Sequence, residues 1–336
     1  MDFLNAIVLM ANFVIVPALT YGSQLALGAI GVTLIYGVLR FANFAYGDLM
    51  AFGTMISILI TWKFQSMGIS FGLLPTALLA LPFAIIATIL VSLFFDKVIF
   101  EYYRIKKSPG VTLIVVSLGL MFVLNGIVRV VIGTGDRQFF DGQKFLIKAN
   151  EFKELTGLNE GLAIKSTQLI TLVTTIFVAL LLFWFLDKTK TGKSMRAYSN
   201  NEDLALLSGI DPNRVVMITW IIASILATVA GTLYGLDKSF KPFTYFNNLL
   251  PIFAAAIVGG IGNPIGAFFG GFLVAFSEIM ITYAYKKVLI YLLPENLEPT
   301  SLMQLLSTDY KFAVSFSILV IVLLFRPNGI FKGKVL

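Results

Sequence analysis

Few side chains in this 336-residue sequence could take part in covalent chemistry, because it contains neither Cys nor His. Without them the chain can form no disulfide, thiol nucleophile, zinc–thiolate site or histidine general base. The acidic residue that lies deepest in an apolar stretch is Glu278, between Phe276 and Met280. A carboxylate inside a membrane is costly and faces the interior of a helix bundle. We therefore expect Glu278 to hydrogen-bond a neighbouring span, and we expect no metal and no cofactor.

A glycine-rich stretch at 259–271, GGIGNPIGAFFGG, is the second notable feature. Gly262, Gly266 and Gly270 recur every four residues, which predicts a face of small residues that packs closely on another helix. An Asn-Pro pair interrupts the apolar run, and this favours either a tight turn or an interrupted helix that lines a solute path. The residues predicted to line the path or to pack its helices are Asn43, Gly259, Gly262, Asn263, Pro264, Gly266 and Glu278.

The triplet Gly192-Lys193-Ser194 resembles the end of a phosphate-binding loop, but its context differs. Such a loop needs a glycine five residues before the Gly-Lys pair and a preceding strand. Asp187 occupies that position, and the preceding segment is apolar over a membrane-spanning length. We therefore expect the chain not to bind ATP itself.

The polar segment 187–212 contains the signature of a short helix. Ser199 and Glu202 have the spacing of a capping box, in which each side chain bonds the other residue's backbone. Gly209 is suited to the left-handed residue that ends such a helix, and Asp211 is suited to begin the next one. The residues expected along one face are Leu204, Ala205, Leu207 and Ser208. So short a helix is marginal unless it docks, either on lipid headgroups or on a soluble partner.

The composition indicates that these residues are held by membrane helices. The chain is 58% hydrophobic and 13% charged, with a mean hydropathy of +0.89, whereas soluble domains are about 25% charged. A spanning helix needs about 20 largely apolar residues. We predict an all-α integral membrane protein, a polytopic bundle of about ten helices. The expected spans are 4–20, 22–39, 46–62, 72–95, 111–134, 166–186, 213–236, 249–260, 264–285 and 311–326.

Ten spans would place both termini on the same side as the 187–212 loop, opposite the 135–165 loop. Basic residues are divided almost evenly between the two sides, so the positive-inside rule favours cytoplasmic termini only weakly. The net charge of +7 is explained by Lys and Arg that flank membrane segments, and we expect no nucleic-acid partner.

Four stretches in order along the chain carry a family resemblance. They are GAIGVTLIYGVLRFANFAYGDLMAFG at 28–53, RAYSNNEDLALLSGI at 196–210, GGIGNPIGAFFGG at 259–271 and LLFRPNGIF at 323–331. Together they resemble the branched-chain amino acid permease family of ABC importers. Two features depart from the family pattern. Tyr46 stands where members commonly carry His, and the loops 135–165 and 286–310 look longer than usual.

The resemblance implies a single transmembrane permease domain over residues 1–336, in a bacterial inner membrane. Two permease subunits would form the pore, and the second one could be a paralogue. Two cytoplasmic ATP-binding subunits would drive it, and a periplasmic solute-binding protein would deliver the solute. The 187–212 loop would then be cytoplasmic and the 135–165 loop periplasmic. The residues implied in ATPase coupling are Arg196, Ser199, Glu202, Leu204, Ala205, Leu207 and Gly209.

Within this resemblance the expected substrates are branched-chain amino acids, and the alternatives are urea, short amides or other amino acids. A secondary transporter coupled to protons or sodium is a remoter alternative, because it would use several intramembrane acids and Glu278 is almost the only deep one. A membrane enzyme acting on lipids would need clustered acids, His or Cys at a membrane face, and the sequence shows no such cluster. We expect the chain not to be an enzyme.

Overall fold

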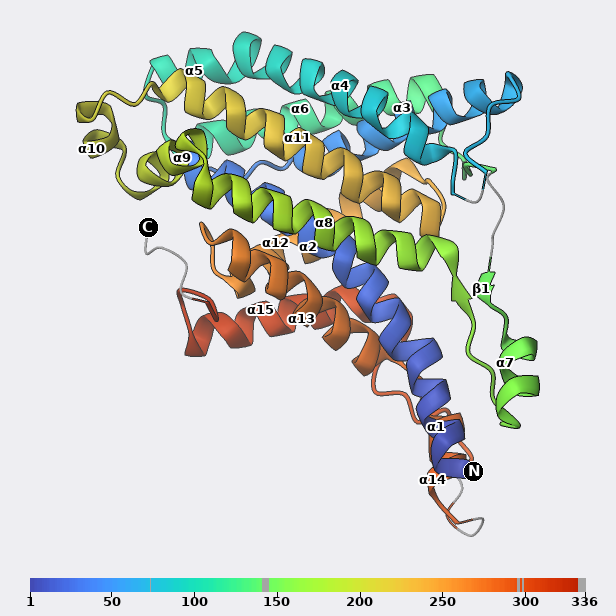
Figure 1. Cartoon of the computed structure of the whole chain (residues 1–336). Helices are drawn as coiled ribbons and strands as arrows, with labels where there is room; N and C mark the ends of the chain where they lie inside the picture. The colour runs from blue at the N-terminus through green and yellow to red at the C-terminus, as the bar shows by residue number, and fades with distance from the viewer. Residues whose placement is uncertain (73, 141–144, 295–296, 298, 332–336) are drawn as a thin grey trace.

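Long helices dominate the computed structural model, which describes residues 1–72, 74–140, 145–294, 297 and 299–331 (Figure 1). Helices satisfy their own backbone hydrogen bonds, as a chain in lipid must. Two of these long helices are continuous stretches made of several elements, with a π-helical turn inside each. The first consists of α1 (Asp2–Met10), η1 (Ala11–Ile15) and α2 (Val16–Leu39), and the second of α4 (Ala77–Phe95), η2 (Asp96–Phe100) and α5 (Glu101–Ile105). The others are α3 (Tyr46–Ser66), α6 (Gly110–Ile132), α8 (Ser166–Lys188), α11 (Pro212–Asp237), α12 (Pro242–Gly259), α13 (Pro264–Thr282) and α15 (Lys311–Phe325). Within the described residues, eight helical stretches are long and apolar enough to cross a membrane, which confirms an all-α polytopic bundle.

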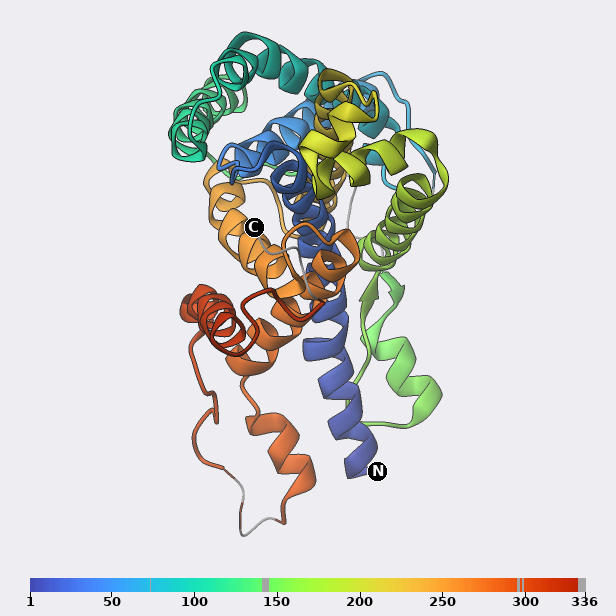
Figure 2. The same cartoon turned by 90° about the vertical axis from the view of Figure 1, so that its left-hand side faces the viewer.

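Shorter elements lie at the two ends of the bundle. They are β1 (Phe145–Ile147), α7 (Ala149–Thr156), β2 (Ile164–Lys165), α9 (Lys190–Asn200), α10 (Glu202–Leu207), α14 (Lys286–Leu292) and the 3-10 turn η4 (Thr308–Tyr310). We call the end that carries α9 and α10 the α9–α10 end, and Figure 2 looks onto it. Arg40, which bonds Ser199 of α9, lies at this end, as do Gly262 and Asn263, which line a cavity together with α9. The opposite end, with β1, α7 and α14, is called the α7 end.

The first two predicted spans, 4–20 and 22–39, form one continuous helix, so the break expected between them is wrong. The helix runs from Asp2 to Leu39 through η1, and the Thr20 hydroxyl donates to the Val16 carbonyl oxygen at 2.9 Å as in any helix interior. Gly22 allows close packing instead of a turn. A Cβ atom there would lie 2.7 Å from Cδ1 and 3.2 Å from Cα of Phe272 in α13.

Because the two predicted spans form one helix, the N-terminus lies on the side of the 135–165 loop and not on the side of the 187–212 loop. The Asn5 side-chain oxygen accepts hydrogen bonds from the backbone N–H groups of Asn159 at 3.0 Å and Glu160 at 3.1 Å, both in the 135–165 loop. The N-terminus lies at the α7 end (Figure 1), whereas the last described residue, Phe331, donates its N–H to the Gly259 carbonyl oxygen at 3.3 Å, beside the α12–α13 turn. The prediction that both termini share the side of the 187–212 loop is therefore wrong for the N-terminus.

The predicted short span at 249–260 is longer in the structure, because α12 already begins at Pro242. Its first turns contain polar residues, of which Tyr245 and Asn248 are buried, and apolarity alone therefore misses this part of the helix. The Tyr245 hydroxyl donates to the Gly231 carbonyl oxygen at 2.9 Å, which ties α12 to α11. The connection between α11 and α12 is therefore only 238–241, around the short bridge between Arg137 and Phe240.

Helix α2 lies at the centre of the bundle and is buried along most of its length, with α8, α11, α12 and α13 packed around it. Small residues make the closest of these approaches possible. A Cβ on Gly271 of α13 would lie 2.5 Å from the Ala26 backbone of α2. The core helices are therefore held by backbone proximity as well as by large apolar side chains.

Candidate functional site

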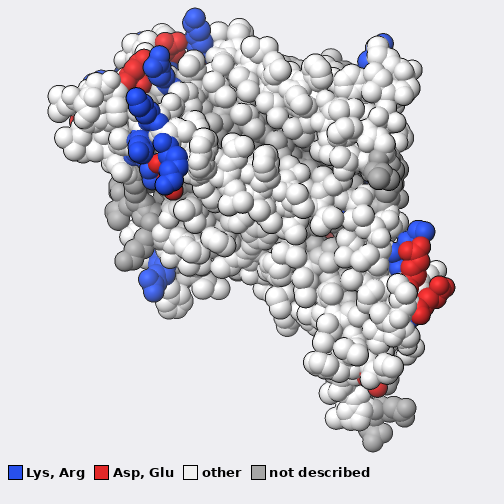
Figure 3. Space-filling view, viewed as in Figure 1, with Lys and Arg blue, Asp and Glu red and all other residues white. Residues whose placement is uncertain are grey.

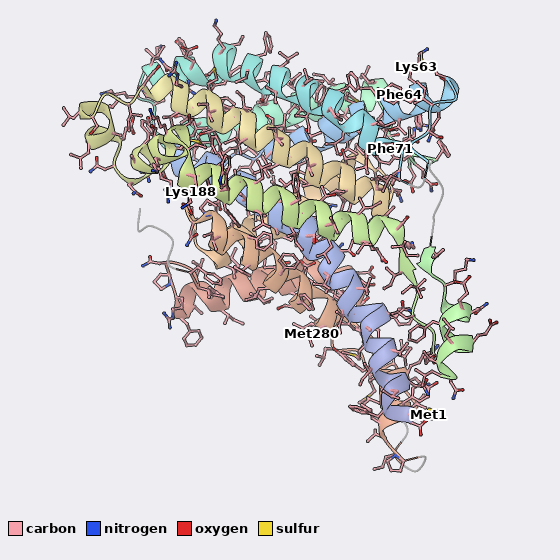
Figure 4. The ribbon with its side chains drawn as sticks, in the orientation of Figure 1. Met1, Lys63, Phe64, Phe71, Lys188 and Met280 are labelled. Carbon is pink, nitrogen blue, oxygen red and sulfur yellow. The ribbon has the colours of Figure 1, made fainter. Side chains whose placement is uncertain are left out.

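Charged side chains gather at the two ends of the molecule. In Figure 3, Lys and Arg concentrate on the α9–α10 end, a mixed cluster lies on α7, and the face between them is almost uncharged. Lys188 marks the first end and Lys63 the far end of the bundle (Figure 4). An uncharged belt between charged ends is what a bilayer requires.

Helix α9 occupies part of the polar loop and is missed by the sequence analysis, which expects one short helix there. The Thr189 hydroxyl oxygen caps it by accepting from the Gly192 N–H at 3.0 Å. A Cβ on Gly192 would lie 2.3 Å from the Phe185 carbonyl oxygen, so glycine lets α9 fold back onto α8. The Thr-x-x-Gly spacing is the local signal from which this helix could have been found.

The predicted capping box at Ser199 is wrong. Ser199 lies in the last turn of α9, and Asn201 is extended and accepts from the Leu204 N–H at 3.1 Å, so Asn201 is the cap of α10. The two signals predicted after this helix, Gly209 at its end and Asp211 at the start of the next helix, are confirmed. Gly209 is left-handed, with φ +78°, and the Asp211 carboxylate accepts from the Asn213 N–H at 2.9 Å at the start of α11.

Helix α10 presents leucines to the outside. Leu204 is exposed and Leu207 is 85% exposed, whereas Ala205 is only 3% exposed and anchors the helix. The residues predicted to share one face of this helix therefore do not share it, because Ala205 is buried whereas Leu204 and Leu207 are exposed. Burying one such leucine contributes roughly 1.5–3 kcal/mol, so this projecting helix is suited to dock.

Side-chain bonds join this end to the membrane helices. Nη2 of Arg40, the left-handed residue that ends α2, donates to the Ser199 carbonyl oxygen at 2.7 Å. The Tyr198 hydroxyl donates to Oε1 of Glu202 at 2.7 Å, and burial together with this carboxylate raises the Tyr198 pKa well above its usual value. A displacement of α9 and α10 would therefore pull on α2.

The interruption at Asn263-Pro264 is a tight turn between α12 and α13 at the α9–α10 end. The Asn263 side chain caps α13 by accepting from the Gly266 N–H at 3.1 Å, and it donates to the Phe331 carbonyl oxygen at 3.0 Å. The Ile330 N–H also donates to the Val258 carbonyl oxygen at 2.9 Å. The backbone of Ile330 and Phe331, at the end of the LLFRPNGIF stretch, is therefore hydrogen-bonded to this turn and to the end of α12.

The predicted glycine face is correct for two of its three members. Gly266 and Gly270 of α13 pack on α12, where added Cβ atoms would lie 2.2 Å from the carbonyl oxygens of Gly259 and Ala255. Gly262 lies in the turn with φ +82° and open space around it, so it serves the chain reversal and not the packing. Its place in the packing is taken by Gly259 of α12.

The prediction that Glu278 bonds a neighbouring span is confirmed. The Ser315 hydroxyl of α15 donates to Oε1 of Glu278, whose side chain is 1% exposed. Gly270, Val274 and Glu278 are all buried along one stripe of α13, as their spacing predicts. Glu278 lies in the last turns of α13, two residues before Met280, which Figure 4 labels, and is remote from Asn263 at the other end of the helix.

We predict a structural role for this carboxyl group. Glu278→Gln keeps the shape and a hydrogen-bond acceptor for Ser315, so most of the uptake should remain. Glu278→Leu leaves the Ser315 hydroxyl without this partner, which costs about 1–3 kcal/mol, and should lower the yield of assembled protein. Gel filtration and uptake assays compare the two variants. Near-complete loss of uptake in well-assembled Glu278→Gln would contradict a structural role.

A second intramembrane pair joins Asp48 of α3 to Asn125 of α6, whose Nδ2 donates to Oδ1 of Asp48 at 2.6 Å. Asp48 lies in the first turn of α3, and no local spacing in the sequence links it to Asn125. Asn43 is buried, and its side-chain oxygen accepts from the Ala45 N–H at 3.0 Å. Asn43 therefore shapes the turn before α3.

A third buried polar group, Asp96, is also missed. Its carboxylate accepts from the Arg104 guanidinium and from Nε1 of Trp220 at 2.8 Å, and so joins the α4–α5 corner to α11.

The predicted coupling residues and the turn residues Gly262, Asn263 and Pro264 meet at the α9–α10 end. Arg196 and Ser199 line the same cavity as this turn. Asn43 and Glu278 do not join this group. No group of three or more acidic residues able to hold a metal ion occurs among the residues that the structure describes.

Comparisons with known proteins cover nearly the whole chain. Residues 14–323 match the family model described as "Branched-chain amino acid transport system / permease component". The high-affinity branched-chain amino acid transport system permease protein LivH of Escherichia coli K12 is 30% identical over 93% of this chain and 92% of its own. BraD of Pseudomonas aeruginosa, which carries the same description, is 28% identical over 94% of both chains. The probable branched-chain amino acid transport permease protein LivM of Methanocaldococcus jannaschii is 26% identical over 47% of this chain and 45% of its own.

Proposed function

The chain belongs to the branched-chain amino acid transport permease family, and we propose that it is the membrane subunit of an importer driven by separate ATP-binding subunits. The observation that carries this proposal is the family match over residues 14–323. The solute would be an aliphatic, branched-chain amino acid, as the names of LivH and BraD suggest.

The exposed helix α10 supports a role in coupling. Its leucines project from the most basic end of the molecule, and Ala205 together with the Arg40–Ser199 bond fixes the helix to the bundle. We propose that α10 docks in a groove of an ATP-binding subunit and transmits its closure to α2 and α11. The coupling residues would be Arg196, Ser199, Glu202, Leu204, Ala205, Leu207 and Gly209, with Ala205, Ser199 and Glu202 acting as anchors.

This docking implies an orientation. The α9–α10 end and the C-terminal tail would be cytoplasmic. The α7 end, with the N-terminus and the 135–165 loop, would face the periplasm across a bacterial inner membrane. This replaces the expectation of two cytoplasmic termini, because α1 and α2 form a single span.

Partners follow from the same proposal. Two ATP-binding subunits would bind at the cytoplasmic end, and a solute-binding protein would deliver its cargo at the α7 end. A second permease would complete the pore, and similarity to LivM as well as LivH favours a paralogous one.

Uptake by proteoliposomes tests the function. The permease is reconstituted with the ATP-binding subunits, the second permease and the binding protein encoded beside it, and radiolabelled leucine, isoleucine, valine and urea are compared. We expect ATP-dependent uptake of the three amino acids. Uptake of urea alone would overturn the substrate, and ATP-independent uptake by this chain alone would favour a secondary transporter.

A further inference from the structure

A cavity of about 300 Å³ lies at the α7 end, where α8 begins and α11 ends (Figure 1). Its apolar wall includes Phe139, Phe140 and Leu236, and its polar wall includes Thr167, Asp237 and Lys238. Sites for small molecules begin at roughly 300 Å³ and combine an apolar wall with a few polar groups. The size and the lining of this cavity therefore suit a small metabolite.

Hydrogen bonds outside the cavity hold its rim in place. The backbone N–H groups of Arg137 and Phe240 each donate to the other's carbonyl oxygen, at 2.9 Å and 2.8 Å. Nε1 of Trp62 in α3 donates to the Gln138 carbonyl oxygen at 2.9 Å. The segment before Phe139 is thus fixed both to α3 and to the α11–α12 connection. A cavity held in this way loses little freedom when it binds a ligand.

The carboxylate of Asp237, the last residue of α11, is the group in this wall that most needs a partner. Its side chain is 7% exposed, and it accepts no hydrogen bond from the residues that the structure describes. Both of its oxygen atoms remain accessible at the cavity, whereas the unpartnered Oδ2 of Asp48 is sealed inside the bundle. A nearly buried carboxylate without donors is costly. Asp237 therefore indicates a ligand that donates hydrogen bonds to it.

The neighbours of this carboxylate decide which ligand it suits. Nζ of Lys238 lies 3.6 Å from Oδ2 of Asp237, beyond hydrogen-bonding distance, and the lysine side chain is 58% exposed, so this ion pair is weak. A metal cation would be repelled by the lysine. The Thr167 hydroxyl also lines the cavity and makes no hydrogen bond within the described part of the chain. A zwitterion satisfies all three groups, because its ammonium group suits Asp237 and Thr167 and its carboxylate suits Lys238.

We propose that this cavity receives an aliphatic α-amino acid between its release by the binding protein and its passage through the pore. The inference rests on the proposed function, from which it takes the solute class and the orientation. The ammonium group binds Asp237 and Thr167, and the carboxylate binds Lys238. The aliphatic side chain lies against Phe139 and Phe140.

Equilibrium binding of radiolabelled leucine to the transporter complex in nanodiscs, without binding protein, tests the site. Asp237→Asn keeps the shape but removes the charge. It should weaken binding at least about tenfold, the effect of losing one hydrogen bond to a charged group. The matched control is Asp136→Asn, because Asp136 forms a similar ion pair with Lys241, at 3.4 Å, and does not line the cavity. It should bind leucine like the wild type.

Competition by 3-methylbutylamine tests the class of ligand. This amine has the ammonium group and the aliphatic chain of leucine but no carboxylate. It should displace radiolabelled leucine more weakly than unlabelled leucine does. Equal displacement would contradict a site for a zwitterion and indicate one for a cationic amine.

Thermal unfolding separates ligand binding from a structural role of Asp237. Without leucine, Asp237→Asn should unfold at the wild-type temperature or above it, because the substitution removes a charge that lacks donors. Leucine should raise the thermal midpoint of the wild type and of Asp136→Asn, and it should raise that of Asp237→Asn less. A lower midpoint of Asp237→Asn without leucine, combined with unchanged leucine binding, would overturn the inference.

Uptake by proteoliposomes tests the role of the site in transport. With binding protein and ATP present, Asp237→Asn should take up leucine several-fold more slowly than Asp136→Asn. Normal uptake by Asp237→Asn would overturn the role in solute entry. Leucine uptake by the wild type, with equal leucine binding by the two variants, would overturn this inference alone and leave the proposed function standing. Absence of leucine uptake by the wild type would overturn both.

Discussion

Leu207→Asp is expected to abolish most ATP-driven uptake while leaving the permease folded. Leu207 is 85% exposed at the tip of α10, so the carboxylate is harmless in the isolated permease. In the proposed ATPase groove the same change removes an apolar contact and buries an unpaired charge. The cost is at least about 2 kcal/mol, which corresponds to roughly a thirtyfold loss. Uptake and ATPase co-purification measure the effect, and Leu204→Asp should act in the same direction.

Leu155→Asp is the matched control. Leu155 is 87% exposed on α7, at the opposite end of the molecule, so the substitution and the exposure are the same and only the location differs. This variant should retain the ATP-binding subunits at wild-type levels. Normal ATPase binding and uptake by Leu207→Asp and Leu204→Asp would exclude α10 as the docking element.

Gly270→Ala should prevent the bundle from assembling normally. The new Cβ atom would lie 2.2 Å from the Ala255 carbonyl oxygen and 3.0 Å from the Gly259 nitrogen, both rigid backbone atoms of α12. Relief requires α12 and α13 to separate, and overpacking of this kind costs about 1–3 kcal/mol or more. The yield of monodisperse protein and its thermal midpoint in detergent should both fall clearly.

Gly126→Ala provides the comparison within another membrane helix. No atom lies within 4 Å of a Cβ built on Gly126 of α6, so the substitution should be neutral or slightly stabilising. Equal stability of Gly270→Ala and Gly126→Ala would contradict the close packing of α12 on α13.

Local chemistry makes part of this structure predictable. The roles of Gly209 and Asp211 are predictable, because a helix end and a helix start depend on residues only a few positions away. Helical periodicity likewise fixes which residues share a face, and Gly270, Val274 and Glu278 accordingly form one buried stripe of α13. The predicted capping box is wrong because the cap of α10 is Asn201 and not Ser199. Ser199 and Asn201 are both good caps, and only the fold of α9 onto α8 decides between them.

Distant contacts explain what the sequence could not predict. Gly22 has the character of a turn residue, but it lies inside α2, where Phe272 from a distant part of the chain packs closely against it. Dividing this one helix into two spans places the N-terminus on the wrong side of the bundle. Likewise, a repeat of four residues does not reveal that Gly262 lies in a turn while Gly259 provides the packing. The Asp48–Asn125 bond joins two helices whose adjacency only the fold establishes.

Site-directed cross-linking tests most directly whether α10 carries the ATPase on the cytoplasmic side. The chain contains no Cys, so Leu207→Cys and Leu155→Cys each introduce a single thiol without further changes. Leu207→Cys should cross-link to the ATP-binding subunit and resist membrane-impermeant thiol reagents added to intact spheroplasts. Leu155→Cys should react with those reagents and form no such cross-link. Labelling of Leu207→Cys from outside, with no cross-link to the ATPase, would contradict both the orientation and the docking role of α10.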